Sequence, residues 1–519
     1  MNALVYPNRQ CERRDAECLA TAKAPGVMKR ALGVIFVASI LLGVRLPGRA
    51  QPAHPGASPP PATAQADDAR IKALAGWSYS LALSAASWGA PLVTMYALRA
   101  NDVFGSTPKA PPNGIWRMSD ISTPELSREA GYVTPNVNVI YGFGFLDLAA
   151  QPVVLTLPDS HGRYYMVEIC DMWTNAFAYP AGAVNGYRGG TYALVGPGWR
   201  GTLPAGVKRI DAPTRWVLIQ PRIHVKNRAD LNAARAVLDA IRTQGLAQYL
   251  GRPAPPTPAY AYPAPVFADA NQPVSALDFQ NPFQFWQILS LALDENPPPK
   301  DQVSALLPMF APLGLKLGTQ WDPSRVNPLI LRSMQQAAAA IGPLLNSFPP
   351  SRVVNGWAVP PPSIGNFRED YLTRAIVGRV GLTANTPREA IYIQAARDDR
   401  GDPLSGERAY AITFRQTPPF VAPGFWSLTM YDASDNYTVP NALGRYALGS
   451  DDELRANPDG TTTIFVGRDK PAAAPDSNWL PAPPGAFYLI LRSYAPGRAL
   501  IESLTDPAAY TPPDVRPIN

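Results

Sequence analysis

Short apolar runs separated by turn-forming residues constrain the fold of this chain more than any other feature. Its 519 residues include 59 prolines and 39 glycines, which is typical of many turns and irregular connections. Runs rich in β-branched and aromatic residues, bounded by Pro, Gly, Asp and Asn, predict a sandwich or barrel and not alternating βαβ units. In the first half, the predicted strands are 152–157, 163–170, 191–195 and 215–220.

Helical patterns precede and follow this first group of strands. Residues 67–98 predict helix with a break at Pro91, and 229–242 predict an amphipathic helix. The proline-rich stretch 253–265 predicts a domain boundary, and the period between 275 and 347 is helical again. A second group of strands is predicted at 389–396, 409–414, 425–431, 462–466 and 487–494.

The N-terminal segment predicts export. Lys29 and Arg30 follow Met28, the apolar run 31–44 carries no charge, and Gly48-Arg49-Ala50 offers small residues before Gln51. This order is that of a secretory signal peptide cleaved between Ala50 and Gln51, which places the mature chain in the periplasm or outside the cell. The apolar run is shorter than the roughly 20 residues of a membrane span. The alternative is a short anchor that is never cut, and translation begins at either Met1 or Met28.

The charge of the mature chain argues against nucleic acid as a partner. Residues 1–50 hold eight of the 46 Lys and Arg residues and three of the 40 Asp and Glu residues. Cleavage would leave 38 basic and 37 acidic residues, so the formal charge of +6 falls to +1. Nothing in this balance predicts a basic nucleic-acid surface.

Familiar catalytic and metal motifs fail their context tests. The GxGxxG pattern at 196–201 is followed by Thr202-Leu203-Pro204, which cannot begin the helix that a dinucleotide site needs, so a turn is predicted. The sequence contains no GxSxG, HExxH or CxxC motif. Two distant histidines, His161 and His224, cannot make a three-histidine zinc site. His161 is predicted in a solvated turn and Cys170 as a buried, unreactive thiol.

We predict no cofactor and no metal site. The acidic loop 398–402 could offer oxygens to a divalent cation such as calcium. Arg400 and the missing distal Glu depart from the calcium-loop pattern, so a solvated hairpin loop is favoured.

Several segments are distinctive enough to carry a family resemblance. In the first half they are Pro152-Val153-Val154-Leu155, Arg163-Tyr164-Tyr165, Asp171-Met172-Trp173-Thr174-Asn175, Val195-Gly196-Pro197-Gly198-Trp199 and Leu203-Pro204-Ala205-Gly206-Val207. In the second half they are 401–406, 425–428, 441–446, 459–460 and 478–481. The chain resembles the bacterial family that pairs a domain of unknown function 1254 with a domain of unknown function 1214.

The resemblance implies a fold that is mainly β with helical segments (α+β). A β-sandwich domain at 67–255 would precede a helical connecting segment at 256–354 and a jelly-roll-like domain at 355–519. Residues 1–50 would be the signal peptide with an upstream extension and 51–66 a disordered linker. Envelope location and homo-oligomers are also implied, but no established reaction. Where the family usually reads Pro-Asn-x-Asp-Thr-Leu-Tyr, this chain has Pro135-Asn136-Val137-Asn138-Val139-Ile140-Tyr141, which lacks the Asp.

Polar residues at the ends of apolar strands are the candidate site, because an unsatisfied buried polar group costs on the order of 1–3 kcal/mol. Tyr141, Asp171 and Arg222 are the catalytic candidates, and we predict that they converge on one pocket. An Arg matches a carboxylate on a ligand bidentately. The alternative is that Arg222 and Asp171 form a buried ion pair. The candidate ligand-binding residues are Asn136, Asn138, Trp173, Asn175 and Arg445.

Three functions remain open from the sequence. The first is an envelope protein that binds a small acidic or amphipathic ligand. The second is a periplasmic hydrolase or lyase with an unusual Asp, Arg and Tyr site. The third is a structural homo-oligomer whose aromatic residues are subunit contacts. The fold class does not decide between them.

Overall fold

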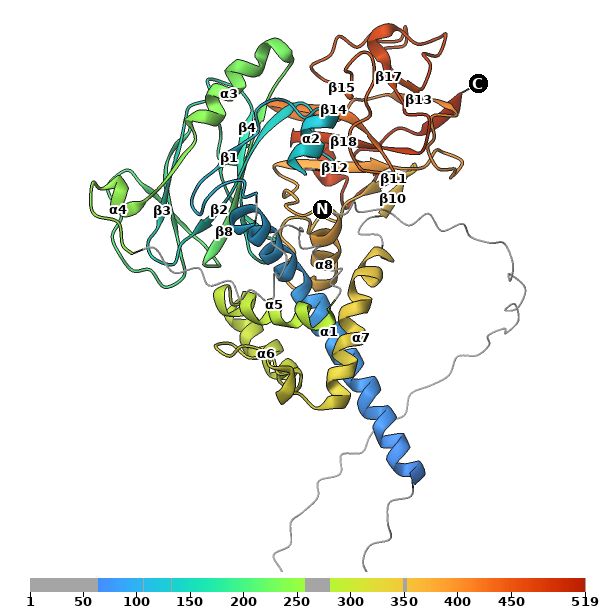
Figure 1. Ribbon diagram of the computed structural model, residues 1–519. Helices are drawn as coiled ribbons and strands as arrows, with labels where there is room; N and C mark the ends of the chain where they lie inside the picture. The colour runs from blue at the N-terminus through green and yellow to red at the C-terminus, as the bar shows by residue number, and fades with distance from the viewer. Residues whose placement is uncertain (1–63, 106, 132, 257–280, 349–351, 519) are drawn as a thin grey trace, which may run out of the picture. The chain divides into compact units, whose positions relative to one another are not determined.

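Two stacked sheets form the first β region of the protein. The computed structural model describes residues 64–105, 107–131, 133–256, 281–348 and 352–518 (Figure 1). The larger sheet has the order β1-β2-β8-β4-β5, with bounds Trp116–Arg117, Val139–Asp147, Trp216–His224, Tyr165–Asp171 and Ala176–Ala181. The smaller sheet has the order β7-β6-β3-β9, with bounds Lys208–Asp211, Gly190–Val195, Val153–Leu157 and Arg242–Gly245.

The central strand β8 is buried on both faces. Successive side chains of a strand point to opposite faces, and Val217, Ile219 and Ile223 pack between the two sheets of the first β region. The intervening residues face the other way, where Trp216 and Leu218 join the core formed with the helices. That second face also carries polar residues, and it is therefore where a buried site can form.

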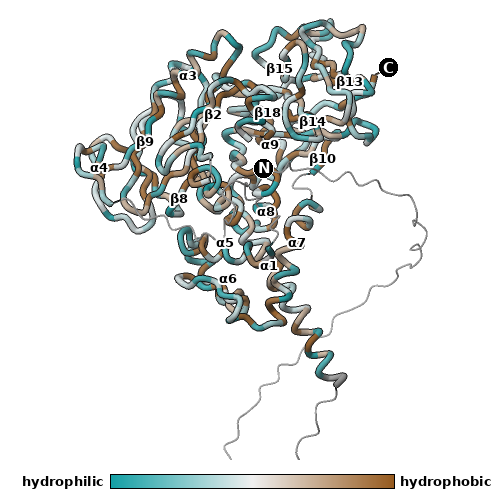
Figure 2. The backbone as a smooth tube through the Cα atoms, viewed as in Figure 1, coloured by the Kyte–Doolittle hydropathy of each residue, from teal (hydrophilic) through white to brown (hydrophobic). Residues whose placement is uncertain are grey.

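A second pair of sheets holds the C-terminal part of the chain. One sheet has the order β10-β11-β12-β18-β14-β15, with bounds Arg352–Val354, Trp357–Val359, Ala390–Ala395, Phe487–Pro496, Phe420–Asp432 and Ala447–Gly449. The other has the order β17-β16-β13-β19, with bounds Trp479–Pro481, Thr462–Gly467, Ala409–Phe414 and Val515–Ile518. An apolar core that includes Trp357, Ile412 and Leu489 lies between them, and Figure 2 shows hydrophobic residues along β18 and its neighbours.

Helices are the other regular elements of the described chain. Those with ten residues or more are α1 (Ala64–Phe104), α3 (Leu231–Ala240), α5 (Pro282–Glu295), α6 (Lys300–Phe310), α7 (Pro328–Asn346) and α8 (Tyr371–Val380). The shorter ones are α2 (Pro124–Ala130), α4 (Leu246–Tyr249) and α9 (Arg498–Glu502), with 3-10 turns at Arg228–Asp230, Ala311–Leu313, Pro323–Arg325 and Asp476–Asn478. From Lys72 onward the described chain forms one compact unit.

Helix α1 corrects one expectation from the sequence. The predicted break at Pro91 is wrong, because α1 continues through Pro91. A proline inside a helix removes one backbone hydrogen bond, but Leu92, Val93 and Met95 are completely buried. Burial of these apolar side chains stabilises the helical path that the proline alone disfavours.

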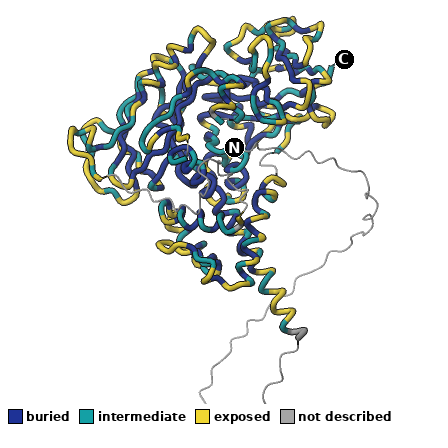
Figure 3. The backbone as a smooth tube through the Cα atoms, in the orientation of Figure 1, coloured by how far each residue is buried: buried dark blue, intermediate teal, exposed yellow. Residues whose placement is uncertain are grey.

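Helix α1 is also the one helix of the described residues that is long and apolar enough to cross a membrane. However, 72% of its most apolar window is buried inside the protein. Figure 3 shows the exposed turns near its N-terminal end, where Trp77 is half exposed, and the buried turns that follow. This burial is that of a core helix.

The α+β architecture predicted from the sequence is confirmed. The four sheets and the helices before and between them follow the predicted order. The jelly-roll connectivity of the second β region stays a prediction, as do the domain boundaries. The predicted signal peptide and the linker up to residue 63 lie outside the described residues.

Candidate functional site

A row of three polar residues lies on the helix-facing side of β8. Gln220, Arg222 and His224 alternate along the strand, and each is at most 4% exposed. They continue the face on which Trp216 and Leu218 pack against the helices. The row therefore extends from the apolar core toward the end of the strand. Sequence reasoning named Arg222 from this row and did not select Gln220 or His224.

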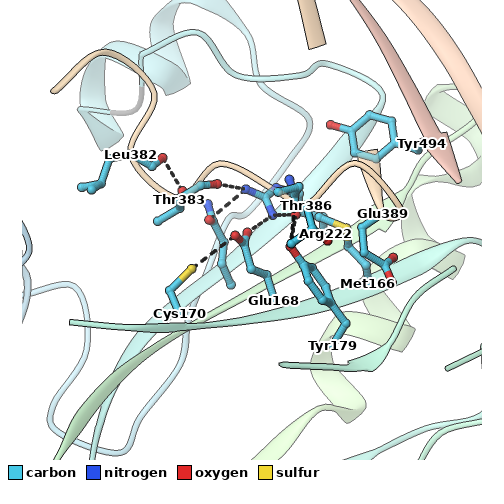
Figure 4. A network of polar contacts seen from close by, with 12 residues as sticks. Met166, Glu168, Cys170, Tyr179, Arg222, Leu382, Thr383, Thr386, Glu389 and Tyr494 are labelled. Carbon is cyan, nitrogen blue, oxygen red and sulfur yellow. Dashed lines mark hydrogen bonds and ion pairs between the residues drawn. The ribbon is translucent and has the colours of Figure 1, made fainter. Parts of the chain in front are cut away.

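Arg222 is neutralised by Glu168 of the neighbouring strand β4. The Arg222 Nη1 donates to Glu168 Oε2 at 2.5 Å (Figure 4). Its Nη2 donates to Gln220 Oε1 at 2.9 Å. Burial raises the pKa of Glu168, while the Arg222 charge acts in the opposite direction. The alternative ion pair between Arg222 and Asp171 is wrong, because Glu168 faces the same side of the sheet as Arg222. Sequence reasoning missed Glu168, although a single carboxylate inside an apolar strand was visible.

Residues from the second half of the chain complete the surroundings of Arg222. Asn385 Oδ1 and the Thr383 carbonyl oxygen both accept from the guanidinium at 3.4 Å. Asn385 Nδ2 donates to the Tyr392 hydroxyl at 2.8 Å, and this hydroxyl donates to Tyr494 at 3.4 Å. A buried polar network thus joins the two β regions, and hydrogen bonds to the protein satisfy most of it.

Tyr141 belongs to this network and lies beside Arg222. The Arg222 guanidinium lies 5.9 Å from the centre of the Tyr141 ring, and the Tyr141 hydroxyl accepts from the Asn136 backbone N–H at 2.8 Å. Asn136 Nδ2 donates to Ser427 Oγ at 3.3 Å and to Tyr494 at 3.2 Å. The structure therefore brings together three of the predicted site residues, Tyr141, Arg222 and Asn136.

Asn138 occupies the place of the missing carboxylate. Its backbone N–H donates to Asn136 Oδ1 at 2.7 Å. Its own Oδ1 is buried and has no hydrogen-bond partner within the described residues. An amide at this position carries no charge, so Asn138 adds neither a base nor a metal-binding carboxylate to the network.

Asp171, Trp173 and Asn175 form a separate local turn after β4. Asp171 Oδ1 accepts from the backbone N–H groups of Trp173 and Asn175, each at 2.9 Å, and Oδ2 accepts from Asn175 Nδ2 at 2.9 Å. Burial raises the pKa of Asp171. Trp173 Nε1 donates to the Asn296 carbonyl oxygen at 3.1 Å, and its ring lies 4.8 Å from Trp88. Asp171 therefore holds a turn here, and its predicted convergence with Tyr141 and Arg222 is wrong.

Arg445 lies among carbonyl groups of the second β region. Its Nη1 donates to the carbonyl oxygens of Asp476 and Trp479 at 2.5 and 2.9 Å. These bonds hold the loop before β15 against the start of β17. No contact joins Arg445 to the network around Arg222 in the described structure. The ligand-binding roles assigned to these residues from the sequence stay predictions.

The other sequence candidates lie as follows. Cys170 is fully buried, its thiol donates to Glu168 Oε1 at 3.2 Å, and burial raises its pKa. The His161 side chain is 89% exposed, in a turn with φ of 53°. Gly198, within the GxGxxG pattern, has φ of 82° in a turn.

No group of three or more His, Cys, Asp or Glu side chains is placed to hold a metal ion within the described residues. In the loop 398–402, Asp398 accepts from the backbone N–H groups of Arg400 and Asp402.

A cleft of about 780 Å³ opens at the end of the polar row, where His224 lies. Such a volume is in the range of small-molecule sites, about 300–1,000 Å³. The turn before β4, helix α3 and the start of β14 surround it. Its polar lining includes Asp159, Ser160, His161, Arg163, Tyr164, His224, Lys226, Asp230, Ser450 and Asp451. Its apolar lining includes Ala233, Ala236, Val237, Ala240, Phe420 and Pro423.

His224 lines this cleft and is held by contacts with Asp451 and Phe425. Its Nε2 lies 2.7 Å from Asp451 Oδ2, and the two side chains are 4% and 13% exposed. The imidazole ring stacks on Phe425, with centroids 3.9 Å apart and planes 7° apart. Arg163 Nη1 donates to the His224 carbonyl oxygen at 2.7 Å. No local pattern predicts this pair, because 227 residues separate its members.

A second pair of charges stands beside His224. Arg163 donates to both oxygens of Asp230, at 2.5 and 2.6 Å. The Arg163 side chain is the largest influence on Asp230 and lowers the pKa of its carboxyl group. This bidentate pair fixes the turn before β4 against the start of α3 and so determines one wall of the cleft.

Another hollow, of about 470 Å³, is lined by residues 103–104 and 108–113. Lys109 is the one charged residue of its described lining, and it pairs with Asp102 at 3.1 Å. This hollow lacks the convergent polar groups of a ligand site, so the cleft at His224 is the better candidate.

The fold of this chain is similar to that of a solved structure. The VPA0106 protein of Vibrio parahaemolyticus has a similar structure, with a TM-score of 0.61 and 22% identity over 85% of this chain and 100% of that chain. At this identity the likeness shows the fold alone. An uncharacterised protein of Burkholderia cenocepacia covers 88% of this chain and 97% of its own, at 12% identity and a TM-score of 0.37. No curated protein matches the chain.

Two family profiles match the sequence itself. Residues 112–245 match the protein of unknown function DUF1254, and residues 389–498 match the protein of unknown function DUF1214. The first match covers the strands of the first β region, and the second covers most strands of the second. The N-terminal half of the chain therefore contains a match to the DUF1254 profile and the C-terminal half a match to the DUF1214 profile.

Proposed function

We propose that this protein binds a small amphipathic ligand in the cleft at His224. The observation that carries the proposal is the mixed lining of the cleft. Four apolar residues of α3, Ala233, Ala236, Val237 and Ala240, line it together with charged side chains. Small-molecule sites combine apolar walls with a few fixed polar groups.

The charges of the lining favour an uncharged ligand over an acidic one. Three carboxylates, those of Asp159, Asp230 and Asp451, face two permanent cations, those of Arg163 and Lys226. Arg163 is already paired with Asp230. An acidic ligand would meet an excess of negative charge in the cleft. Of the two predicted ligand classes, acidic and amphipathic, the lining therefore favours amphipathic molecules without a negative charge.

Binding of Nile red, an uncharged amphipathic dye, to the full chain tests the proposal by fluorescence titration. Ala236 is exposed on α3 and lines the cleft. Ala236→Trp should fill the cleft without disturbing the core and weaken binding by roughly tenfold or more. Asn232→Trp is the matched control, because Asn232 is exposed on the same helix outside the described lining. Equal affinities of the two variants would overturn the proposal.

We also propose that the chain is exported and forms a homo-oligomer. The order of basic, apolar and small residues at 28–50 supports export. N-terminal sequencing of the protein from a periplasmic extract should begin at Gln51, and an intact Met1 or Met28 on soluble cytosolic protein contradicts this. Sedimentation equilibrium of the same material should give at least twice the mass of one chain, and the mass of a single chain would contradict the oligomer.

A further inference from the structure

The two ring nitrogens of His224 differ in their contacts. Nε2 is hydrogen-bonded to the Asp451 carboxylate, whereas Nδ1 can accept a proton. Because a carboxylate only accepts hydrogen bonds, the short contact to Asp451 places the proton of the neutral ring on Nε2. Nδ1 then carries a lone pair. This arrangement, in which a carboxylate fixes the tautomer and orientation of an imidazole, is the one that general bases use.

The Nδ1 atom is open to the cleft. It makes no hydrogen bond to any residue that the structure describes. Nor is Nδ1 among the described side-chain atoms that are both fully buried and without a hydrogen-bond partner. Because His224 lines the cleft, a water molecule or ligand in the cleft can reach this nitrogen.

The hydroxyl groups of the described lining are engaged elsewhere. Ser160 Oγ donates to the Arg163 carbonyl oxygen at 2.6 Å. Ser450 Oγ donates to the Trp426 carbonyl oxygen at 3.3 Å and accepts from the Trp426 backbone N–H at 3.1 Å. The Tyr164 hydroxyl donates to Met166 Sδ at 3.3 Å, and burial raises its pKa well above the ordinary value. With these hydroxyl groups engaged, the group that His224 can activate as a nucleophile is a water molecule.

Lys226 supplies a positive charge to the same cleft. Of the two permanent cations in the described lining, Arg163 is committed to Asp230. The Lys226 ammonium group makes no ion pair with the described residues, and the side chain is exposed at the cleft. A cation beside a reacting carbonyl group stabilises the negative charge that develops on its oxygen.

We propose that the cleft hydrolyses an uncharged amphipathic ester, with His224 as the general base. The inference rests on the proposed function, because the ester is the ligand that the cleft would bind. Nδ1 takes a proton from water while the water oxygen bonds to the acyl carbon. The bond between this carbon and the alkoxy oxygen then breaks, and the proton on Nδ1 passes to the leaving oxygen. The products are an alcohol and an acid, Lys226 balances the charge on the carbonyl oxygen, and Asp451 keeps its hydrogen bond to Nε2.

Acid release from methyl hexanoate by the full chain, followed in a pH-stat, tests the proposal. His224→Gln should lower kcat by about 10²–10⁴-fold, the usual contribution of a general base, and should keep the affinity for Nile red. Asn232→Trp is the control with unchanged turnover. Absence of acid release by the wild-type protein, or equal kcat in His224→Gln, overturns the inference.

Asp451 is a positioning residue in this mechanism, and its test needs a readout beyond the rate. Asp451→Asn should lower kcat and leave KM unchanged, because the amide group can also donate to Nε2 and so move the ring proton to Nδ1, the atom that must accept a proton from water. A KM that rises while kcat stays unchanged would show that Asp451 acts only on the shape of the cleft, and would overturn its assigned role.

The two proposals fail in different ways. If Ala236→Trp and Asn232→Trp bind Nile red equally, the cleft is not the binding site and the proposed function fails. If Ala236→Trp alone weakens binding but the wild-type protein releases no acid, the cleft binds ligands without hydrolysing them. In that case only the catalytic inference is lost.

Discussion

Glu168 and Arg222 are a buried pair of opposite charges within the larger sheet of the first β region. Their side chains are 0% and 5% exposed, so removal from water costs each of them several kcal/mol. Their mutual attraction and the bonds to Gln220 and Asn385 offset this cost. The pair therefore contributes more to the arrangement of the strands than to net stability.

A double substitution separates these two contributions. Glu168→Gln should lower the free energy of unfolding by about 3–5 kcal/mol, because it leaves the Arg222 charge buried without its partner. Glu168→Leu combined with Arg222→Met should cost much less than the single change, since well-packed apolar residues can replace a buried pair. Urea unfolding at pH 7 measures both. A double variant as unstable as Glu168→Gln would contradict this account.

At the scale of elements, the tight turn after β5 depends on a carboxylate from the other half of the chain. Gly182 and Gly186 exchange backbone hydrogen bonds of 3.1 and 2.8 Å. Glu389 accepts from the next two N–H groups, those of Ala183 at 2.7 Å and Val184 at 3.0 Å. Gly182 leaves room for this contact, because a Cβ atom there would lie 2.4 Å from Glu389 Oε2.

The two glycines of this turn should respond differently to substitution. Both have positive φ, 146° at Gly182 and 80° at Gly186, so alanine is strained at either position by about 1–3 kcal/mol. Only Gly182→Ala also displaces Glu389, since no atom lies within 4 Å of a Cβ at Gly186. Gly182→Ala should therefore lower the midpoint of thermal unfolding more than Gly186→Ala. Equal shifts would show that the carboxylate moves away at little cost.

At the scale of the whole molecule, polar groups join the two β regions. Arg492 Nη2 donates to the Thr134 carbonyl oxygen at 2.8 Å, and the Tyr431 hydroxyl donates to the Pro135 carbonyl oxygen at 2.5 Å. Glu389 and the pair of His224 and Asp451 add two further connections. Burial raises the pKa of Glu389 among these groups, so the stability of the molecule should depend on pH.

Glu389 gives this dependence a definite sign. Burial raises the pKa of Glu389 in the folded protein, so the folded state binds the proton more tightly than the unfolded state. The free energy of unfolding then falls as the pH rises from about 4.3, the ordinary value for Glu, through the folded pKa. Glu389→Gln removes this term, and its stability relative to the wild type should improve over that range. Urea unfolding at several pH values measures the difference, and parallel curves would contradict the assignment.

The sequence predicted the elements better than it predicted the site. The strand at 409–414 and those near 153–157 and 487–494 coincide with β13, β3 and β18, because alternating apolar residues between turn signals are a local pattern. Asn136, Tyr141 and Arg222 were selected as polar residues in apolar surroundings, and they lie together. Their hydrogen-bond partners include Glu168 and Tyr494. No local sequence pattern linked these partners to the three residues.

The sequence by itself determined the α+β architecture, the order of helices and strands, and the two matched domains. Turn residues and hydrophobic periodicity act over a few residues, so they can be read without knowing the fold. Only the tertiary structure decided that Glu168 and not Asp171 pairs with Arg222, and that His224 meets Asp451 at a cleft. Such contacts depend on the registry of strands and on the packing of distant segments, and a local pattern of residues contains neither.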